Sequence, residues 1–130
     1  MTVKDIFDSA LRILAESTVS GDNDDYEERA PYLIAAFCTE AQDADAMLRR
    51  ATDEAEQEQF SPVFIPLDSE FPLLGRFACT AALYLAAMLV LDYDSELSDR
   101  LYDKYSDSMA RLCETIPFVS EAIGDRYGFC

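Results

Sequence analysis

The stretch FACTAALYLAAMLVL, residues 77–91, is apolar at every position except Thr80. A membrane-spanning helix needs about 18 or more such residues, so this stretch is too short to predict a span. A helix that is apolar on nearly every side lies in the middle of a bundle or in a subunit interface. We therefore predict a central helix that begins near residue 70, has Pro72 in its first turn and buries Leu83, Leu85, Met88 and Leu91.

Three further helices are predicted by apolar residues at three- and four-residue spacing. Thr2 and Asp5 match a weak capping box at the start of the first helix. Pro31 lies inside the second helix, where it removes a hydrogen bond and predicts a kink or a restart. The turn DYD at residues 92–94 is so short that the last helix must run antiparallel to the central one. These three helices are expected over residues 2–16, 24–50 and 95–114.

The segment after the second helix divides into two parts. Residues 52–59 are acidic and are expected simply to extend the second helix. The following FSPVFIPL, residues 60–67, has two prolines and is expected to lie extended, as a loop or a short strand. Pro117 ends the last helix. The predicted fold class is therefore all-α: a four-helix bundle-like domain over residues 1–117, with a long loop between its second and third helices, followed by a C-terminal tail over residues 118–130.

Charge is the most distinctive property of the composition. The chain has 130 residues, with 26 Asp and Glu against 10 Lys and Arg, and its formal net charge is −16. Proteins that bind nucleic acid neutralise phosphates with Lys and Arg, and anionic membranes also attract basic residues. We therefore expect no sequence-specific nucleic-acid binding and no membrane association, and a basic surface on any partner.

The sequence lacks histidine, and its acidic residues do not have the spacing of a known metal site. Histidine is absent, which excludes Ser/His and Cys/His catalysis and histidine-ligated zinc. The acidic stretches at residues 22–25 and 92–96 lack the glycine and glutamate that an EF-hand loop requires. Glu54, Glu56 and Glu58 have no second helical set of acids to complete a magnesium site. We therefore predict that the protein is not an enzyme, with no catalytic residue, no cofactor and no metal.

The cysteines are expected to be structural. None of them forms a CxxC motif, and three lie in apolar helical patterns, where a free cysteine behaves as a small hydrophobic residue. We expect reduced thiols, which are typical of a cytosolic compartment. The four residues are Cys38, Cys79, Cys113 and Cys130.

Two surfaces are candidates for binding. On the last helix Asp99, Asp103 and Asp107 recur at four-residue steps, flanked by basic residues. An ordinary solvated face is the first interpretation, and a functional acidic face is the alternative. The apolar residues of the loop and the tail either pack on the core or dock on another molecule, and we hypothesise docking. The expected partner-binding residues are Phe60, Val63, Phe64, Ile65, Ile123, Tyr127 and Phe129.

Five segments that span nearly the whole chain support a resemblance to a known family. They are TVKDIFDSALRILAE (2–16), DYEERAPYLI (25–34), FIPLDSEFP (64–72), LDYDSELSDRLYDKYSDSMARL (91–112) and IGDRYGF (123–129). In their order around the apolar helix they resemble the small head–tail connector (adaptor) proteins of tailed bacteriophages, in particular those encoded by prophages of Gram-positive bacteria.

The resemblance implies a structural protein of virion assembly. Such a subunit forms an oligomeric ring below the portal and continues the DNA channel, and in the family a longer loop between helices interlocks neighbours. Residues 51–67 are in the matching place. The implied partners are the portal protein, neighbouring copies of the chain and other head–tail joining proteins. The implied locations are the bacterial host cytoplasm and the head–tail junction of the virion. The alternative function is an acidic helical regulatory protein, either a DNA mimic or a partner-binding inhibitor.

Overall fold

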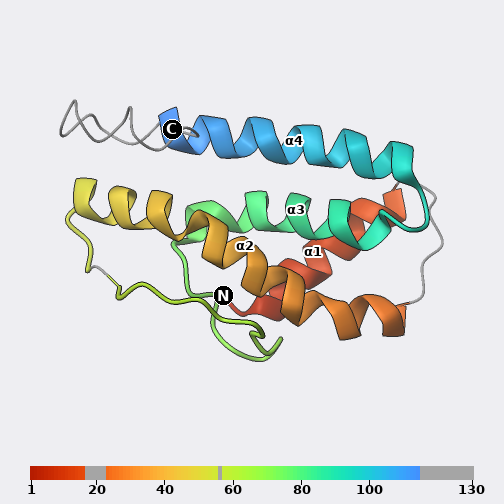
Figure 1. The fold of residues 1–130 in the computed structure, drawn as a ribbon, viewed down its shortest axis with the longest axis horizontal. Helices are drawn as coiled ribbons and strands as arrows, with labels where there is room; N and C mark the ends of the chain where they lie inside the picture. Colours follow the sequence, from red (N-terminus) through yellow and green to blue (C-terminus); the bar gives the residue numbers. More distant parts are fainter. Residues whose placement is uncertain (17–22, 56, 115–130) are drawn as a thin grey trace.

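The computed structural model describes residues 1–16, 23–55 and 57–114, and this part of the chain is all-α (Figure 1). No strand occurs in the described part, where the only ladder pairing is an isolated antiparallel bridge between Thr2 and Glu70. The predicted fold class is confirmed. The helices are α1 (Val3–Glu16), α2 (Asn23–Ala51), the 3-10 turn η1 (Gly75–Phe77), α3 (Ala78–Val90) and α4 (Ser95–Glu114).

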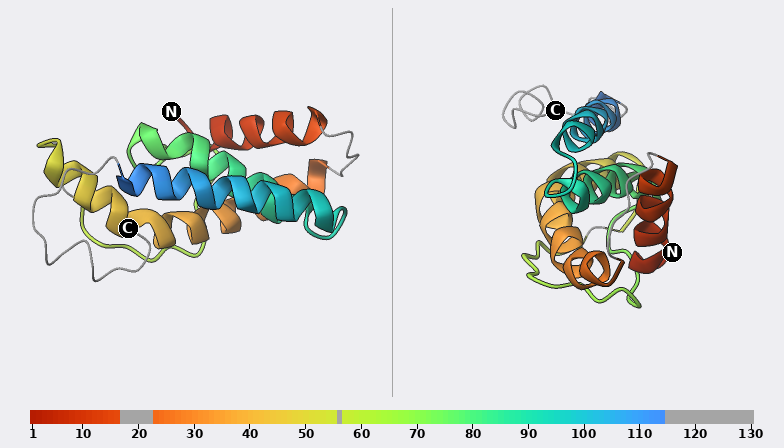
Figure 2. Two further views of the ribbon diagram at one scale, coloured as in Figure 1. Left: turned by 90° about the horizontal axis from the view of Figure 1, so that it is seen from above. Right: turned by 90° about the vertical axis from the view of Figure 1, so that its right-hand side faces the viewer.

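The apolar helix α3 lies at the centre of the bundle. Seen end-on, α4 lies on one side of α3, while α1 and α2 lie on the other sides (Figure 2). The turn between α3 and α4 makes these two helices antiparallel, as predicted (Figure 1). Small residues let the neighbouring helices approach closely, and larger ones fill the spaces between them. The buried residues of α3 are Thr80, Ala81, Ala82, Leu85, Ala86, Ala87, Leu89 and Val90.

The central helix begins later than the sequence predicted. The segment before it is extended because it pairs with the start of the chain: the Phe71 N–H donates to the Met1 carbonyl at 3.0 Å. The carbonyls of Ser69 and Leu67 accept the N–H groups of Val3 and Lys4, at 2.9 and 2.8 Å. These two donors belong to the first turn of α1 and have no partner within their own helix. Residues 67–71 therefore cap α1, and the prediction of Pro72 inside a helix is wrong.

Of the four residues predicted to be buried in the central helix, one is fully buried, two are half-buried and the last is half-exposed. Leu85 is completely buried, and Leu83 and Met88 are half-buried against the core. Leu91, however, is 47% exposed. The prediction for Leu91 is wrong because α3 ends at Val90 and Leu91 begins the turn to α4.

The first helix starts with the predicted capping box, and a side chain also caps the start of α4. The Thr2 N–H donates to Asp5 Oδ2 at 2.9 Å, and the Asp5 N–H donates to Thr2 Oγ1 at 3.3 Å. This reciprocal pair is a capping box with aspartate in place of glutamate. The hydrogen bonds from Thr2 lower the pKa of the Asp5 carboxyl. At the start of α4, Asp94 Oδ1 accepts the Leu97 N–H at 3.1 Å.

The second helix continues through Pro31 without a restart and ends in a defined C-terminal motif. The Glu54 N–H donates to the Arg49 carbonyl at 2.8 Å, and the Asp53 N–H to the Arg50 carbonyl at 3.4 Å. This is the bonding pattern of a Schellman motif, in which the residue after the helix takes a left-handed conformation. Asp53 does so, with φ of 59°. The motif ends α2 at Ala51, so the expected extension of the helix over residues 52–59 is wrong.

The conformation of Asp53 gives a test of this helix end. Asp53→Gly should raise the free energy of unfolding by about 0.5–1 kcal/mol, because glycine adopts positive φ without steric cost. The matched control is Asp53→Ala, which removes the same charge but keeps a Cβ, and it should leave stability unchanged or lower it. Urea unfolding followed by circular dichroism measures both. Equal stabilisation by the two variants would show that charge, and not the backbone, limits stability at this position.

Two leucines, one in the middle of the apolar stretch and one at its end, test the central position of α3. Leu85→Ala should lower the free energy of unfolding by about 2–5 kcal/mol, because it leaves a cavity in a fully packed site. Leu91→Ala removes the same atoms from a half-exposed site and should change it by less than about 0.5 kcal/mol. Denaturant unfolding of both variants measures the difference. Similar losses at the two positions would contradict the described burial.

Candidate functional site

The loop between α2 and α3, residues 52–74, runs back along α2 (Figure 1). Three side-chain and backbone contacts fix its course. Asp43 Oδ1 accepts the Gln59 side-chain amide at 3.2 Å, and Gln42 Oε1 accepts the Phe60 N–H at 2.9 Å. Further along, the N–H of Ile65 donates to the carbonyl of Pro31 at 3.2 Å. The loop is thus attached to α2 over several turns and does not project as a free arm.

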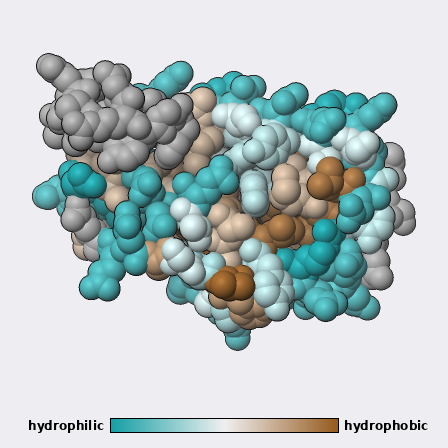
Figure 3. Space-filling view, in the orientation of Figure 1, coloured by the Kyte–Doolittle hydropathy of each residue, from teal (hydrophilic) through white to brown (hydrophobic). Residues whose placement is uncertain are grey.

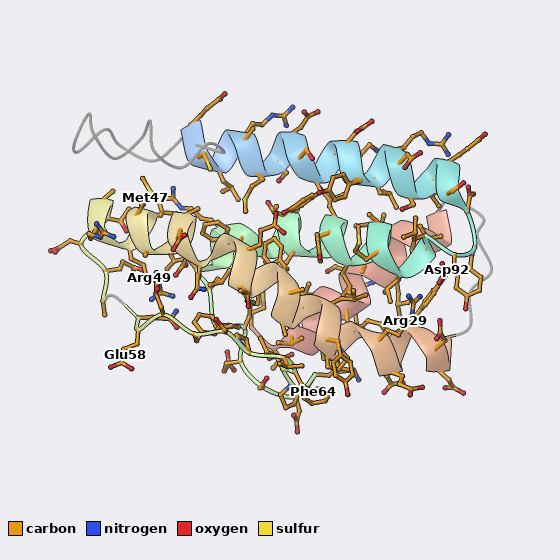
Figure 4. The ribbon with its side chains drawn as sticks, in the orientation of Figure 1. Arg29, Met47, Arg49, Glu58, Phe64 and Asp92 are labelled. Atoms are coloured by element: carbon orange, nitrogen blue, oxygen red, sulfur yellow. The ribbon has the colours of Figure 1, made fainter. Side chains whose placement is uncertain are left out.

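A buried ion pair holds the two ends of this loop, and we call it the Asp45–Arg49 clasp. Asp45 is 3% exposed, and its Oδ2 lies 2.8 Å from Arg49 Nε. Asp45 Oδ1 accepts the Leu74 N–H at 2.8 Å. The two terminal nitrogens of Arg49 donate to the carbonyls of Ala55 and Pro72, at 3.1 and 3.3 Å (Figure 4). One turn of α2 therefore binds both the beginning and the end of the loop.

The clasp was not predicted, although the sequence of α2 contains a signal for it. Asp45 directly follows Ala44 on the apolar stripe and precedes Leu48, so its carboxylate is placed among buried residues. A buried carboxylate requires a partner, and Arg49 stands one turn later, where it can reach it. The carbonyls that complete the clasp come from distant parts of the loop, and no local pattern identifies them.

The structure divides the four predicted binding residues of the loop into two pairs. Ile65 is buried in the core, and Phe60 is half-buried against it. The hypothesis that they contact another molecule in place of the core is wrong for these two residues. Their neighbours in the extended segment point outward: Val63 is 76% exposed and Phe64 is 48% exposed.

Val63 and Phe64 form an exposed apolar patch together with Tyr32 of α2, and we call it the loop-tip patch. The rings of Phe64 and Tyr32 meet edge to face, with centroids 5.0 Å apart. Tyr32 is 52% exposed and was not predicted as a site residue. Apolar surface lies at the lower edge of the molecule in Figure 3, where Figure 4 places Phe64. The sequence contains a signal that Tyr32 is exposed, because it is a large aromatic residue outside the apolar stripe of α2.

The remaining predicted site residues lie on α4 or in the tail. Asp99, Asp103 and Asp107 are all exposed on α4, opposite its buried stripe. Exposed Arg100, Lys104 and Arg111 alternate with them along the helix. Acidic and basic side chains that alternate in this way are typical of a solvated helix face. Ile123, Tyr127 and Phe129 lie outside the described residues.

The thiols do not form a reactive site in the described part of the chain. Burial raises the pKa of the Cys38 thiol to about 12, which keeps it protonated and unreactive. Cys79 is a free thiol on the surface at the start of α3. Cys113 is disulfide-bonded, so the prediction of reduced cysteines is wrong at this position. Periodicity placed Cys113 on the buried side of α4, but it carries no information about a covalent partner.

Comparison with known proteins identifies no relative: no family model, no curated protein and no solved structure matches the chain. Among the described residues, no group of three or more Asp, Glu, Cys or His side chains is arranged to hold a metal ion. The described helices are also too short or too polar to cross a bilayer. The candidate site is the loop-tip patch, on the loop whose two ends the clasp holds.

Removal of the clasp should show how strongly it holds the loop. Asp45→Ala should lower the free energy of unfolding by about 3–5 kcal/mol, because it leaves Arg49 unpaired in a largely buried site. It should also speed hydrogen exchange at the Leu74 amide, which loses its acceptor. Asp43→Ala is the matched control, because it removes an exposed contact two residues away, the carboxylate that accepts the Gln59 side chain, and it should cost no more than about 1 kcal/mol. Unchanged exchange at Leu74 in Asp45→Ala would contradict the clasp.

Proposed function

We propose that this protein is a head–tail connector subunit of a tailed bacteriophage, a structural protein that forms a ring below the portal and continues the DNA channel. The observation that supports this best is the exposed loop-tip patch of Tyr32, Val63 and Phe64. It lies on the loop between α2 and α3, the element that interlocks neighbours in the family that the sequence resembles. The partners would be neighbouring copies, the portal protein and other head–tail joining proteins.

The patch has the physical properties of an interface anchor. Apolar surface gains about 25 cal/mol per Å² when it leaves water, and aromatic residues dominate interface energetics. The edge-to-face contact with Tyr32 and the hydrogen bond from the Ile65 N–H to the Pro31 carbonyl hold Phe64 in place before binding. A segment ordered in advance loses little conformational entropy on docking. Ile123, Tyr127 and Phe129 remain predicted contacts of the same assembly.

The charge of the chain agrees with a role around DNA that does not include binding it. The net charge is −16, and exposed carboxylates such as Asp99, Asp103 and Asp107 repel phosphates. A channel that lets DNA pass must not hold it, and an acidic lining would serve this purpose. Assembly in the host cytoplasm, followed by residence at the head–tail junction of the virion, would follow from this role.

The alternative of an acidic regulator is favoured less by the observed surface. A DNA mimic presents carboxylates in place of phosphates, whereas on α4 the exposed Arg100 and Lys104 interrupt the acidic series. A mimic also has no need of the exposed Val63 and Phe64. These two observations favour the connector.

Phe64 and Leu91 provide a matched test, because they are 48% and 47% exposed. Phe64→Asp should leave stability within about 0.5 kcal/mol of wild type, since the position is half-exposed. It should abolish co-purification with the portal protein encoded in the same phage genome and the ring assemblies visible by negative-stain electron microscopy. Leu91→Asp, at the opposite turn, should preserve both.

Two outcomes would count against the proposal in different ways. If the wild-type chain neither binds the portal protein nor forms rings at any concentration, the connector function is wrong. If Phe64→Asp assembles as well as wild type, the connector function can stand, but the loop-tip patch is not its interface.

A further inference from the structure

A second aromatic cluster lies away from the loop, where α2 and α4 both contact α3. It combines Phe37 of α2, Tyr84 of α3, and Tyr102 and Tyr105 of α4. The ring centroids of Tyr84 and Tyr105 are 5.2 Å apart, and those of Tyr102 and Tyr105 are 5.3 Å apart. Phe37 lies 5.7 Å from Tyr84 and 6.2 Å from Tyr105. Tilted and edge-to-face pairs at these distances are attractive, so the four rings support one another, with Phe37 and Tyr105 buried and Tyr102 at the surface.

An acidic group lies at the exposed edge of this cluster. The Tyr105 hydroxyl donates to Glu40 Oε1 at 2.9 Å. Burial, and after it the charge of Glu40, raises the pKa of the Tyr84 phenol. Glu40 is exposed, and the bond from Tyr105 occupies only one of its two carboxylate oxygens. The carboxylate is therefore fixed in place and can still accept hydrogen bonds from outside.

Tyr102 extends the cluster to the surface and has acidic neighbours. It is 41% exposed. Asp99, three residues earlier, is its neighbour on the same side of α4, and Asp103 follows it directly. Arg100 and Lys104 are two residues away on either side, a spacing that turns them away from Tyr102. The surface around the ring of Tyr102 is therefore aromatic and negatively charged, and we call Glu40, Tyr84, Tyr102 and Asp99 the tyrosine face.

We propose that the tyrosine face is a docking site for a basic, amphipathic segment of a partner protein. A Lys or Arg of that segment would lie over the ring of Tyr102 and pair with the carboxylate of Glu40, and apolar residues beside it would cover Tyr84. A cation over an aromatic ring is attracted by the negative face of the ring, and a carboxylate beside it adds to the attraction.

Charge decides between this occupant and the other candidates. A second copy of the chain would bring a net charge of −16 against a face that is itself acidic, and like charges oppose association. Nucleic acids and anionic membranes are also negatively charged, so the acidic face would repel them as well. The inference does not depend on the connector function, because none of these residues belongs to the loop.

The test uses two synthetic peptides of 18 residues with one amphipathic helical pattern, one built of Arg and Leu and the other of Glu and Leu. We expect the Arg/Leu peptide to bind the full-length chain in isothermal titration calorimetry, and the Glu/Leu peptide not to bind. Glu40→Gln and Tyr102→Ala should each weaken binding by about three- to tenfold, from the loss of a charged partner or of a cation–π contact. Circular dichroism verifies that each variant is folded.

The matched control is Asp107→Asn, which removes one carboxylate from a position five residues after Tyr102, turned away from the tyrosine face. It should change the affinity by less than about twofold, as expected for a remote, screened charge. Equal weakening by Glu40→Gln and Asp107→Asn would mean that the peptide binds the net charge and not the tyrosine face, and would overturn the inference. Self-association of the chain that Tyr102→Ala abolishes would also overturn it, because the occupant would then be a second copy.

Discussion

An apolar helix that has to be covered on every side is the constraint on which the rest of this structure depends. α4 covers one side of α3, and α1 and α2 cover the others (Figure 2). The polar contacts in these seams are internal to the bundle: the Ser98 hydroxyl donates to the Ala87 carbonyl at 2.8 Å, and the Thr80 and Ser108 hydroxyls lie 2.6 Å apart. The burial of α3 removes apolar surface from water, and the free energy gained must exceed the electrostatic repulsion among the 26 acidic residues.

The second constraint is the loop of residues 52–74, whose middle part, residues 60–67, has two prolines that disfavour a helix and is too apolar to remain free. Its attachment uses polar groups of α2, above all the Asp45–Arg49 clasp. A buried ion pair adds little net stability compared with apolar residues of the same size, because both charges must be desolvated. Its contribution here is positional, because it fixes where the loop begins and ends. Val63 and Phe64 are exposed because Ile65 is anchored.

Helix periodicity predicted much of this architecture, because amphipathic patterns are local. α4 has its predicted bounds of residues 95–114, and the capping box of Thr2 and Asp5 forms as expected. The start of α3 was wrong because the competing structure, the pairing of Phe71 with Met1, joins residues that are far apart in the sequence. The candidate site was predicted only in part for the same reason. Composition identified an apolar loop, but whether Ile65 or Phe64 faces the core depends on contacts with Pro31 and Tyr32 that no local pattern contains.

The two proposed surfaces place different requirements on a partner. The loop-tip patch offers three apolar side chains, whereas a stable interface buries about 800 Å² on each side, so much of any ring contact must come from polar surface around it. In a ring of identical subunits that polar surface would be mostly acidic. The acidic surfaces of neighbouring subunits repel each other over a distance of about one Debye length, roughly 8–10 Å in physiological salt. Subunits can therefore associate through Phe64 only if the acidic faces are held apart or are covered by something basic. The tyrosine face on α2 and α4 has the chemistry for such a cover, because Glu40 and Tyr102 present a carboxylate and an aromatic ring to an incoming cation. A basic segment of a partner protein bound there would lower the net charge of each subunit, and it would make association through the loop tips more favourable without a direct contact between the two surfaces.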